Sequence, residues 1–130
     1  MFRKVNNLGD WSRDLQWIMD QKDGSRFPLT DLFIDDKTVV VKLALAGFSE
    51  NDIELEMVGN KLIISGEIEE TDEPFEYVQK QISQKPFERT IALHEDYVAG
   101  DVSASFVNGI LEARIEPIEK ERKLISIKAA

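Results

Sequence analysis

The stretch that decides the fold is Val102-Ser-Ala-Ser-Phe-Val-Asn-Gly-Ile-Leu-Glu-Ala-Arg-Ile-Glu-Pro117. Apolar and polar residues alternate over 102–106 and again over 111–115, which is the period of a β-strand with one buried face. The dipeptide Asn108-Gly109 between them is the strongest short-range signal for a two-residue β-hairpin. We expect Pro117 to end the second strand, because proline cannot donate a hydrogen bond to a sheet. The stretch therefore predicts two antiparallel strands joined by a tight turn.

Working outward, the same two-residue period recurs over 39–45, 53–57 and 87–93, and a short apolar run covers 62–64. Gly59-Asn60 predicts a second hairpin, 67–74 reads as an acidic loop, and 75–82 could hold a short strand or only a loop. No helical period occurs between Pro28 and Pro117. Short strands separated by turn signals predict an all-β, immunoglobulin-like antiparallel β-sandwich.

The charge of the chain is unevenly distributed. Its 130 residues carry a net charge of −9 and no cysteine. Residues 28–117 hold 7 Lys and Arg against 19 Asp and Glu, whereas 1–27 and 118–130 are net positive. We therefore divide the chain into an N-terminal arm (1–27), a domain (28–117) and a C-terminal tail (118–130).

This composition excludes several classes of function. Disulfide scaffolds and thiol chemistry need cysteine, and an acidic body disfavours nucleic acid as a partner. No apolar run approaches a membrane span, and polar residues follow Met1-Phe2-Arg3-Lys4, so we expect neither a membrane segment nor a signal peptide. The absence of cysteine fits a reducing compartment, and we expect a cytoplasmic protein.

The arm predicts a short amphipathic helix over about 11–22, capped by Asp10 and ended by Gly24. One face of this helix carries Trp11, Leu15, Ile18 and Met19, and Trp17 lies nearby. This face either docks on the domain core or serves as an adhesive arm for self-assembly and apolar partners.

The tail ends in Leu124-Ile125-Ser126-Ile127 after a charged linker. In an extended segment Ile125 and Ile127 point to the same side. The segment is either a last strand of the same sandwich or a peptide that adds to another surface.

Catalytic motifs are missing from the sequence. The single histidine, His94, precedes two acids, a pattern that is more typical of a solvated loop than of a general base or metal ligand. No phosphate loop, nucleophile elbow or zinc-protease motif occurs. We therefore expect no catalytic, cofactor-binding or metal-binding residues, and a binding or assembly protein.

Five motifs in order resemble the small heat shock proteins, which carry an α-crystallin domain. The strongest is Ala104-Ser-Phe-Val-Asn-Gly-Ile-Leu111, similar to the family signature A-x-x-x-N-G-(I/V/L)-L, with Asn108, Gly109 and Leu111 forming the hairpin. The others are Phe87-Glu-Arg89, Asn60-Lys-Leu-Ile-Ile-Ser-Gly66, Pro28-Leu-Thr-Asp31 and Ile125-Ser-Ile127. The Ala46-Gly47-Phe48 turn and Phe87-Glu-Arg89 are most similar to the bacterial inclusion-body-binding (class A) branch.

The resemblance implies an ATP-independent holdase that binds partly unfolded proteins and forms dynamic oligomers. It implies a strand swap between subunits through Phe75, Tyr77, Val78 and Ile82, with the accepting edge near Leu29–Phe33. Ile125 and Ile127 would anchor the tail in a groove of another subunit, where the matching strands carry Ile53, Leu55, Met57, Val102 and Ala104. The arm residues Trp11, Leu15, Trp17, Ile18 and Met19 would contact clients.

The chain departs from the family at Ala46-Gly47-Phe48, where Pro-Gly-Val is common, and at Leu93-His94, where Leu-Pro is common. The segment 77–84 is also poorer in arginine than usual. Expected partners are unfolded clients, further copies of the chain, and ATP-driven chaperones downstream. We expect no nucleic acid as a partner and no membrane span. Two alternatives remain: a monomeric co-chaperone or adaptor of the CS/p23 type, and a small hydrolase using His94 with Asp96 or Asp35.

Overall fold

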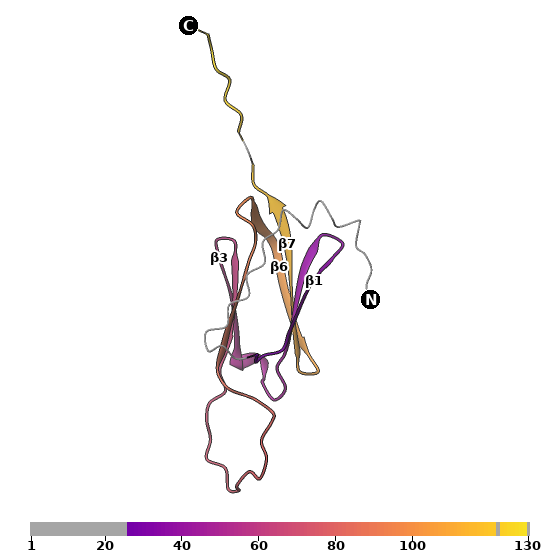
Figure 1. Cartoon of the computed structure of the whole chain (residues 1–130), viewed down its shortest axis with the longest axis vertical. Helices are drawn as coiled ribbons and strands as arrows, with labels where there is room; N and C mark the ends of the chain where they lie inside the picture. Colours follow the sequence, from indigo (N-terminus) through magenta and orange to yellow (C-terminus); the bar gives the residue numbers. More distant parts are fainter. Residues whose placement is uncertain (1–25, 122, 130) are drawn as a thin grey trace.

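The computed structural model describes residues 26–121 and 123–129, which form two antiparallel sheets packed face to face (Figure 1). One sheet has the strand order β1-β2-β7-β6 and the other β3-β4-β5. The predicted all-β sandwich is therefore confirmed. The strands are β1 (Thr30–Asp35), β2 (Thr38–Ala44), β3 (Ile53–Val58), β4 (Lys61–Gly66), β5 (Phe87–Ala92), β6 (Tyr97–Val107) and β7 (Ile110–Glu119).

Alternation places the core between the two sheets. Val39, Val41 and Leu43 of β2 point inward beside the inward residues of β7, and all three are fully buried. Leu62 and Ile64 of β4 face them from the other sheet. Full burial of one such side chain stabilises the fold by about 1.5–3 kcal/mol, so this double layer fixes the register of both sheets.

Two tight turns join the strands where the sequence predicts hairpins. Asn108 and Gly109 both have positive φ, 54° and 78°, between Val107 and Ile110, which pair with each other. Positive φ at both positions gives the turn a twist that matches its strands. In the turn between β3 and β4, Gly59 alone has positive φ (64°), at the first of the two turn positions.

The expected end of the last strand at Pro117 is wrong. β7 continues to Glu119, and Pro117 stands opposite Ala99 of β6. The pairing of β2 with β7 ends at Ile115, so beyond that point one side of β7 has no neighbouring strand. A proline on that open side sacrifices no hydrogen bond of the sheet.

Two smaller differences concern local irregularities. β6 begins at Tyr97, five residues before the alternating pattern, because a bulge between Ala99 and Val102 breaks the period of two. A single 3₁₀ turn at Glu50–Asp52 interrupts the region that we expect to lack helix. The segment 75–82, for which a strand or a loop is expected, contains no strand.

The end of the sandwich near Pro28 is closed by one arginine and three aromatic rings. Arg89 of β5 is only 3% exposed, and its guanidinium donates hydrogen bonds to the carbonyls of Pro28 (2.7 Å) and Arg26 (3.3 Å). Beside it, Phe27 packs against Phe48 and Phe87 with ring centroids 5.7–6.1 Å apart across the trio. Residues 26–28 are thus fastened to the sandwich.

The helix predicted over 11–22 lies outside the described residues. Among the residues that the structure describes, no helix is long and apolar enough to cross a membrane.

Candidate functional site

An apolar hollow of about 170 Å³ opens between β3 of one sheet and β6 of the other. Both strands are edge strands, because β3 pairs only with β4 and β6 only with β7. Ile53 and Leu55 line the hollow from β3, and Ala104 and Phe106 line it from β6. The edges of the two sheets do not pair with each other, so this seam leaves inward-facing apolar side chains half open to solvent.

The structure brings three of the five predicted groove residues to this hollow. Ile53, Leu55 and Ala104 line it, whereas Met57 and Val102 are not among the lining residues. Met57 shares the face of Leu55 but packs against the core, and Val102 lies next to the bulge in β6. Their role in binding a tail stays a prediction.

The predicted groove residues do not include four residues that line the hollow: Glu50, Ser105, Phe106 and Leu111. Phe106 and Leu111 stand opposite each other across the Asn108-Gly109 hairpin. The register of this hairpin could therefore have predicted that Leu111 lies beside Phe106 in the same site. The position of β3 relative to this hairpin depends on how the two sheets pack. No local sequence pattern predicts that packing.

Charges around the hollow are acidic. Glu50 lines it, and Glu54 and Glu56 are the exposed residues that alternate with Ile53 and Leu55 along β3. None of these three carboxylates has an ion pair with any residue that the structure describes.

The cations of the four-stranded sheet are engaged on its outer face. Arg114 donates a hydrogen bond from Nε to Glu112 (2.8 Å) and approaches Asp35 at 3.4 Å, while Lys42 lies 3.7 Å from Glu112. The hydrogen bond from Arg114 lowers the pKa of Glu112 below its usual value. These cations are therefore occupied by their own carboxylates.

The tail carries the apolar residues that the sandwich leaves uncovered. Ile125 and Ile127 are 82% and 94% exposed, and Leu124 is 95% exposed. Figure 1 shows this segment leaving the end of β7 and running away from both sheets. In an extended chain Ile125 and Ile127 share one side, and Leu124 lies on the other.

The loop between β4 and β5 projects from the opposite end of the sandwich (Figure 1). All four predicted swap residues are exposed: Phe75, Tyr77, Val78 and Ile82, at 50–104%. Phe75 and Tyr77 contact each other edge to face at 5.4 Å, and a hydrogen bond with Glu73 raises the pKa of Tyr77. Lys80 Nζ lies 4.8 Å from the centre of the Tyr77 ring, while Phe75, Val78 and Ile82 stay largely open to solvent.

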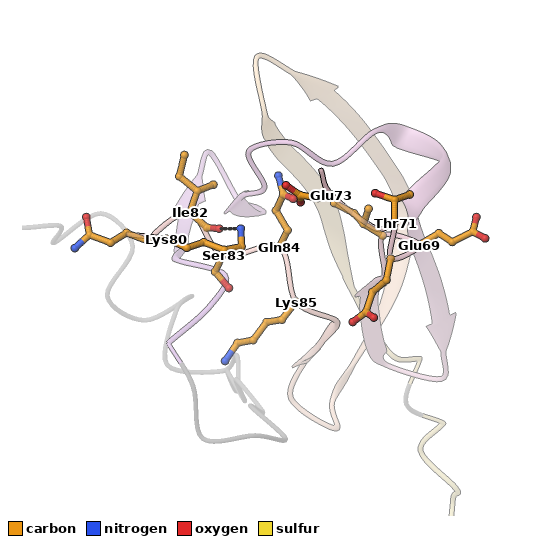
Figure 2. A pocket seen from close by; sticks show the side chains of 11 residues that line it. Glu69, Thr71, Glu73, Lys80, Ile82, Ser83, Gln84 and Lys85 are labelled. Atoms are coloured by element: carbon orange, nitrogen blue, oxygen red, sulfur yellow. Dashed lines mark hydrogen bonds between the residues drawn. The ribbon is translucent and has the colours of Figure 1, made fainter. Parts of the chain in front are cut away.

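The two limbs of this loop enclose a hollow of about 520 Å³, which Figure 2 shows from close by. Glu69, Thr71 and Glu73 lie on one limb, and Lys80, Ile82 and Gln84 lie on the other. Lys80 donates a hydrogen bond to the carbonyl of Ile82 (3.1 Å) within its own limb. The lining is mostly polar and mixed in charge, which is typical of an open loop more than of a pocket for an apolar ligand.

The residues of the hydrolase alternative do not form a catalytic arrangement. His94 and Asp96 lie in one turn, 3.4 Å apart, and the Asp96 amide donates to His94 Nδ1. Asp35 instead faces Arg114 across the outer face of the four-stranded sheet. Over residues 26–121 and 123–129, no group of three or more His, Asp or Glu is placed to hold a metal ion.

The five predicted arm residues lie outside the described residues. They are Trp11, Leu15, Trp17, Ile18 and Met19.

Comparisons with known proteins agree with one another. Residues 31–129 match the model of the Hsp20/alpha crystallin family. The small heat shock protein IbpB of Shigella boydii is 32% identical over 115 residues, which cover 83% of this chain and 79% of that protein. Among solved structures, heat shock protein 16.0 of Schizosaccharomyces pombe superposes with a TM-score of 0.62 at 30% identity, covering 84% of this chain and 88% of the other. A small heat-shock protein from Xylella fastidiosa, described as having a distinct high order structure, superposes with a TM-score of 0.58 at 25% identity, covering 79% and 95%.

Proposed function

Because the chain belongs to the Hsp20/alpha crystallin family, we propose a division of labour among its parts that makes it an ATP-independent holdase. The protein binds partly unfolded proteins, prevents their aggregation and assembles into oligomers. Its relatives are small heat shock proteins, and the CS/p23-type alternative finds no support among them. Like the rest of this family of chaperones, it holds clients without a catalytic step.

The observation that carries this function is the separation of two complementary surfaces. An apolar hollow stays open between β3 and β6, while the tail presents Ile125 and Ile127 almost fully to solvent. We assign the tail of one copy to the hollow of another.

The reach of the tail supports contact between copies over contact within one copy. The amide of Lys120 is hydrogen-bonded to the Asp96 carbonyl (2.8 Å), which fixes where the tail begins. From Leu111 to Lys120, β7 runs about 30 Å at its ordinary rise. The five residues from Lys120 to Ile125 reach at most about 18 Å. The tail is therefore too short to place Ile125 beside Leu111 of its own chain.

The free energies involved predict that each tail contact is weak and that the assembly is dynamic. Burial of two isoleucines contributes roughly 1.5–3 kcal/mol each, and ordering a free tail removes several kcal/mol of that gain. One tail holds loosely, whereas many tails per assembly act together. Release of subunits then uncovers apolar surface for clients.

The remaining assignments follow the same division. The loop residues Phe75, Tyr77, Val78 and Ile82 pair with the β1 edge of a partner, and the arm (1–27) contacts clients. The acidic body (28–117) keeps client complexes apart by repulsion. We place the protein in the cytoplasm, where ATP-driven chaperones accept its clients.

The function is tested with a heat-aggregating enzyme whose light scattering is followed without ATP. We expect the protein to suppress scattering at near-stoichiometric ratios. Scattering that is unaffected, or suppressed only when ATP is added, would contradict a holdase.

The tail assignment is tested by Ile125→Ala together with Ile127→Ala. We expect size-exclusion chromatography with light scattering to show small species in place of large assemblies. Leu124→Ala is the matched control, because it removes a similar apolar side chain from the opposite side of the tail and should leave the assembly mass unchanged. Large assemblies in the double variant would refute the assignment.

A further inference from the structure

We propose that the groove between β3 and β6 selects the tail of a second copy by charge as well as by apolar fit, so that salt concentration controls assembly. This inference rests on the tail–groove contact proposed above. Three glutamates along this edge, Glu50, Glu54 and Glu56, form what we call the acidic rim. We infer that this rim attracts the basic residues of the tail.

The rim is built into the edge of the sandwich. Glu50 lines the hollow itself, and Glu54 and Glu56 alternate along β3 with the apolar lining residues. Glu50 faces the hollow, whereas Glu54 and Glu56 project from the outer face of the same edge strand, beside the path of a tail that lies along this edge.

Little positive charge offsets the rim locally. β3 and β6, the strands that border the groove, contain no lysine or arginine, and β6 adds Asp101 near the bulge. The three-stranded sheet holds two cations: Lys61, which pairs with Val58 beyond the far end of the lining residues, and Arg89, which is buried and donates to the Pro28 carbonyl. Arg114 and Lys42 are bound to Glu112 and Asp35 on the outer face of the other sheet.

The tail has the opposite charge. Residues 120–130 contain four Lys and Arg and one Glu. Lys123 shares the side of Ile125 and Ile127 in an extended chain, and Lys128 follows directly. Cations therefore bracket the apolar anchors, and both surfaces are complementary in charge.

Complementary exposed charges give a modest and salt-sensitive gain. A pair of this kind changes affinity roughly two- to fivefold. Such attraction extends about 10 Å at 0.1 M salt and about 3 Å at 1 M salt. The apolar part of the contact is not screened, so salt should weaken assembly without abolishing it.

The test uses the full chain with Glu54→Lys and Glu56→Lys (rim reversal), Lys123→Glu and Lys128→Glu (tail reversal), and all four together. Assembly mass is measured by light scattering across protein concentrations, from about 0.05 M to about 0.5 M NaCl. We expect salt to raise the midpoint concentration of wild-type assembly about fivefold or more. Each reversal should raise it at low salt, and the combined variant should recover the wild-type midpoint.

Controls separate the charge effect from misfolding and from the tail contact itself. Glu95→Lys with Glu116→Lys makes the same charge change on exposed residues outside the groove and should not raise the midpoint, because it only lowers the repulsion between bodies. Circular dichroism verifies that each variant keeps the β-sandwich.

The outcomes distinguish the two proposals. If Ile125→Ala with Ile127→Ala dissolves the assemblies but salt and both reversals have no effect, the charge inference is wrong and the tail contact stands. If the rim reversal changes client protection without changing assembly, the groove binds clients and the tail is not its occupant. Failure of the combined variant to recover, while it remains folded, also overturns charge recognition.

Discussion

At the scale of the residue, Arg89 is the one buried charged side chain among the described residues. Alternation along β5 turns it inward with Ile91, although arginine rarely lies inside a protein. Its guanidinium is satisfied there by two backbone carbonyls, those of Arg26 and Pro28. These acceptors lie more than 60 residues earlier in the chain, so no local pattern reveals them.

We expect Arg89→Met to lower the free energy of unfolding by about 2–4 kcal/mol. Methionine fills much of the volume but leaves the two carbonyls without their donor, and a hydrogen bond from a charged group contributes about 1.5–3 kcal/mol. Denaturant unfolding followed by circular dichroism measures the change. Arg114→Met is the matched control: its ion pairs are partly exposed to solvent, so its loss should be much smaller than that of Arg89→Met. Equal losses in the two variants would contradict the role of Arg89.

At the scale of the element, the sequence predicts what local chemistry determines. The Asn108-Gly109 turn needs only two residues with positive φ, and the core faces of β2, β3 and β7 follow from a period of two. The two-residue period does not predict the faces of the whole of β6, because a bulge near Gly100 shifts that period. Pro117 misleads for another reason: whether a proline interrupts a strand depends on which neighbours flank that strand.

The groove is partly predictable for a related reason. The resemblance supplies the candidates on β3 and β6, and three of them, Ile53, Leu55 and Ala104, line the hollow. The extent of the groove depends on how two separate sheets align, and this excludes Met57 and includes Leu111. Such long-range alignment is decided by packing of the whole core.

The loop between β4 and β5 leads to a prediction at this scale. Val78→Asp should weaken dimers measurably, because a charge would enter the apolar contact that we propose with a partner subunit. The same change should leave unfolding of the sandwich within about 0.5 kcal/mol, because Val78 is fully exposed. Analytical ultracentrifugation of a tail variant, Ile125→Ala with Ile127→Ala, isolates the dimer step. Thr71→Asp on the other limb is the control, and an equal effect there would argue for simple repulsion.

At the scale of the whole molecule, charge and apolar surface are divided between segments. The body (28–117) carries the negative charge, and the tail joins exposed apolar residues to positive charge. In the assembly that we propose, attraction between the tail of one copy and the body of another competes with repulsion between bodies. On this proposal, salt and dilution shift the assembly size.

The boundary between arm and body gives the last prediction. Phe27 packs against Phe48 and Phe87, and the carbonyl of Arg26 accepts a hydrogen bond from Arg89, so residues 26–28 are part of the closing cluster of the sandwich. Removal of 1–25 should keep the midpoint of thermal unfolding near that of the full chain and sharply reduce protection of a heated client, because Trp11, Trp17 and their apolar neighbours leave with it.

Removal of 1–28 should also lower the unfolding midpoint, since one aromatic ring and the acceptors of Arg89 are lost together. The comparison of the two truncations separates loss of client contact from loss of fold, because only the shorter deletion leaves the closing cluster intact. Full client protection by the chain that begins at Arg26 would show that the arm is dispensable and would move client binding to the body.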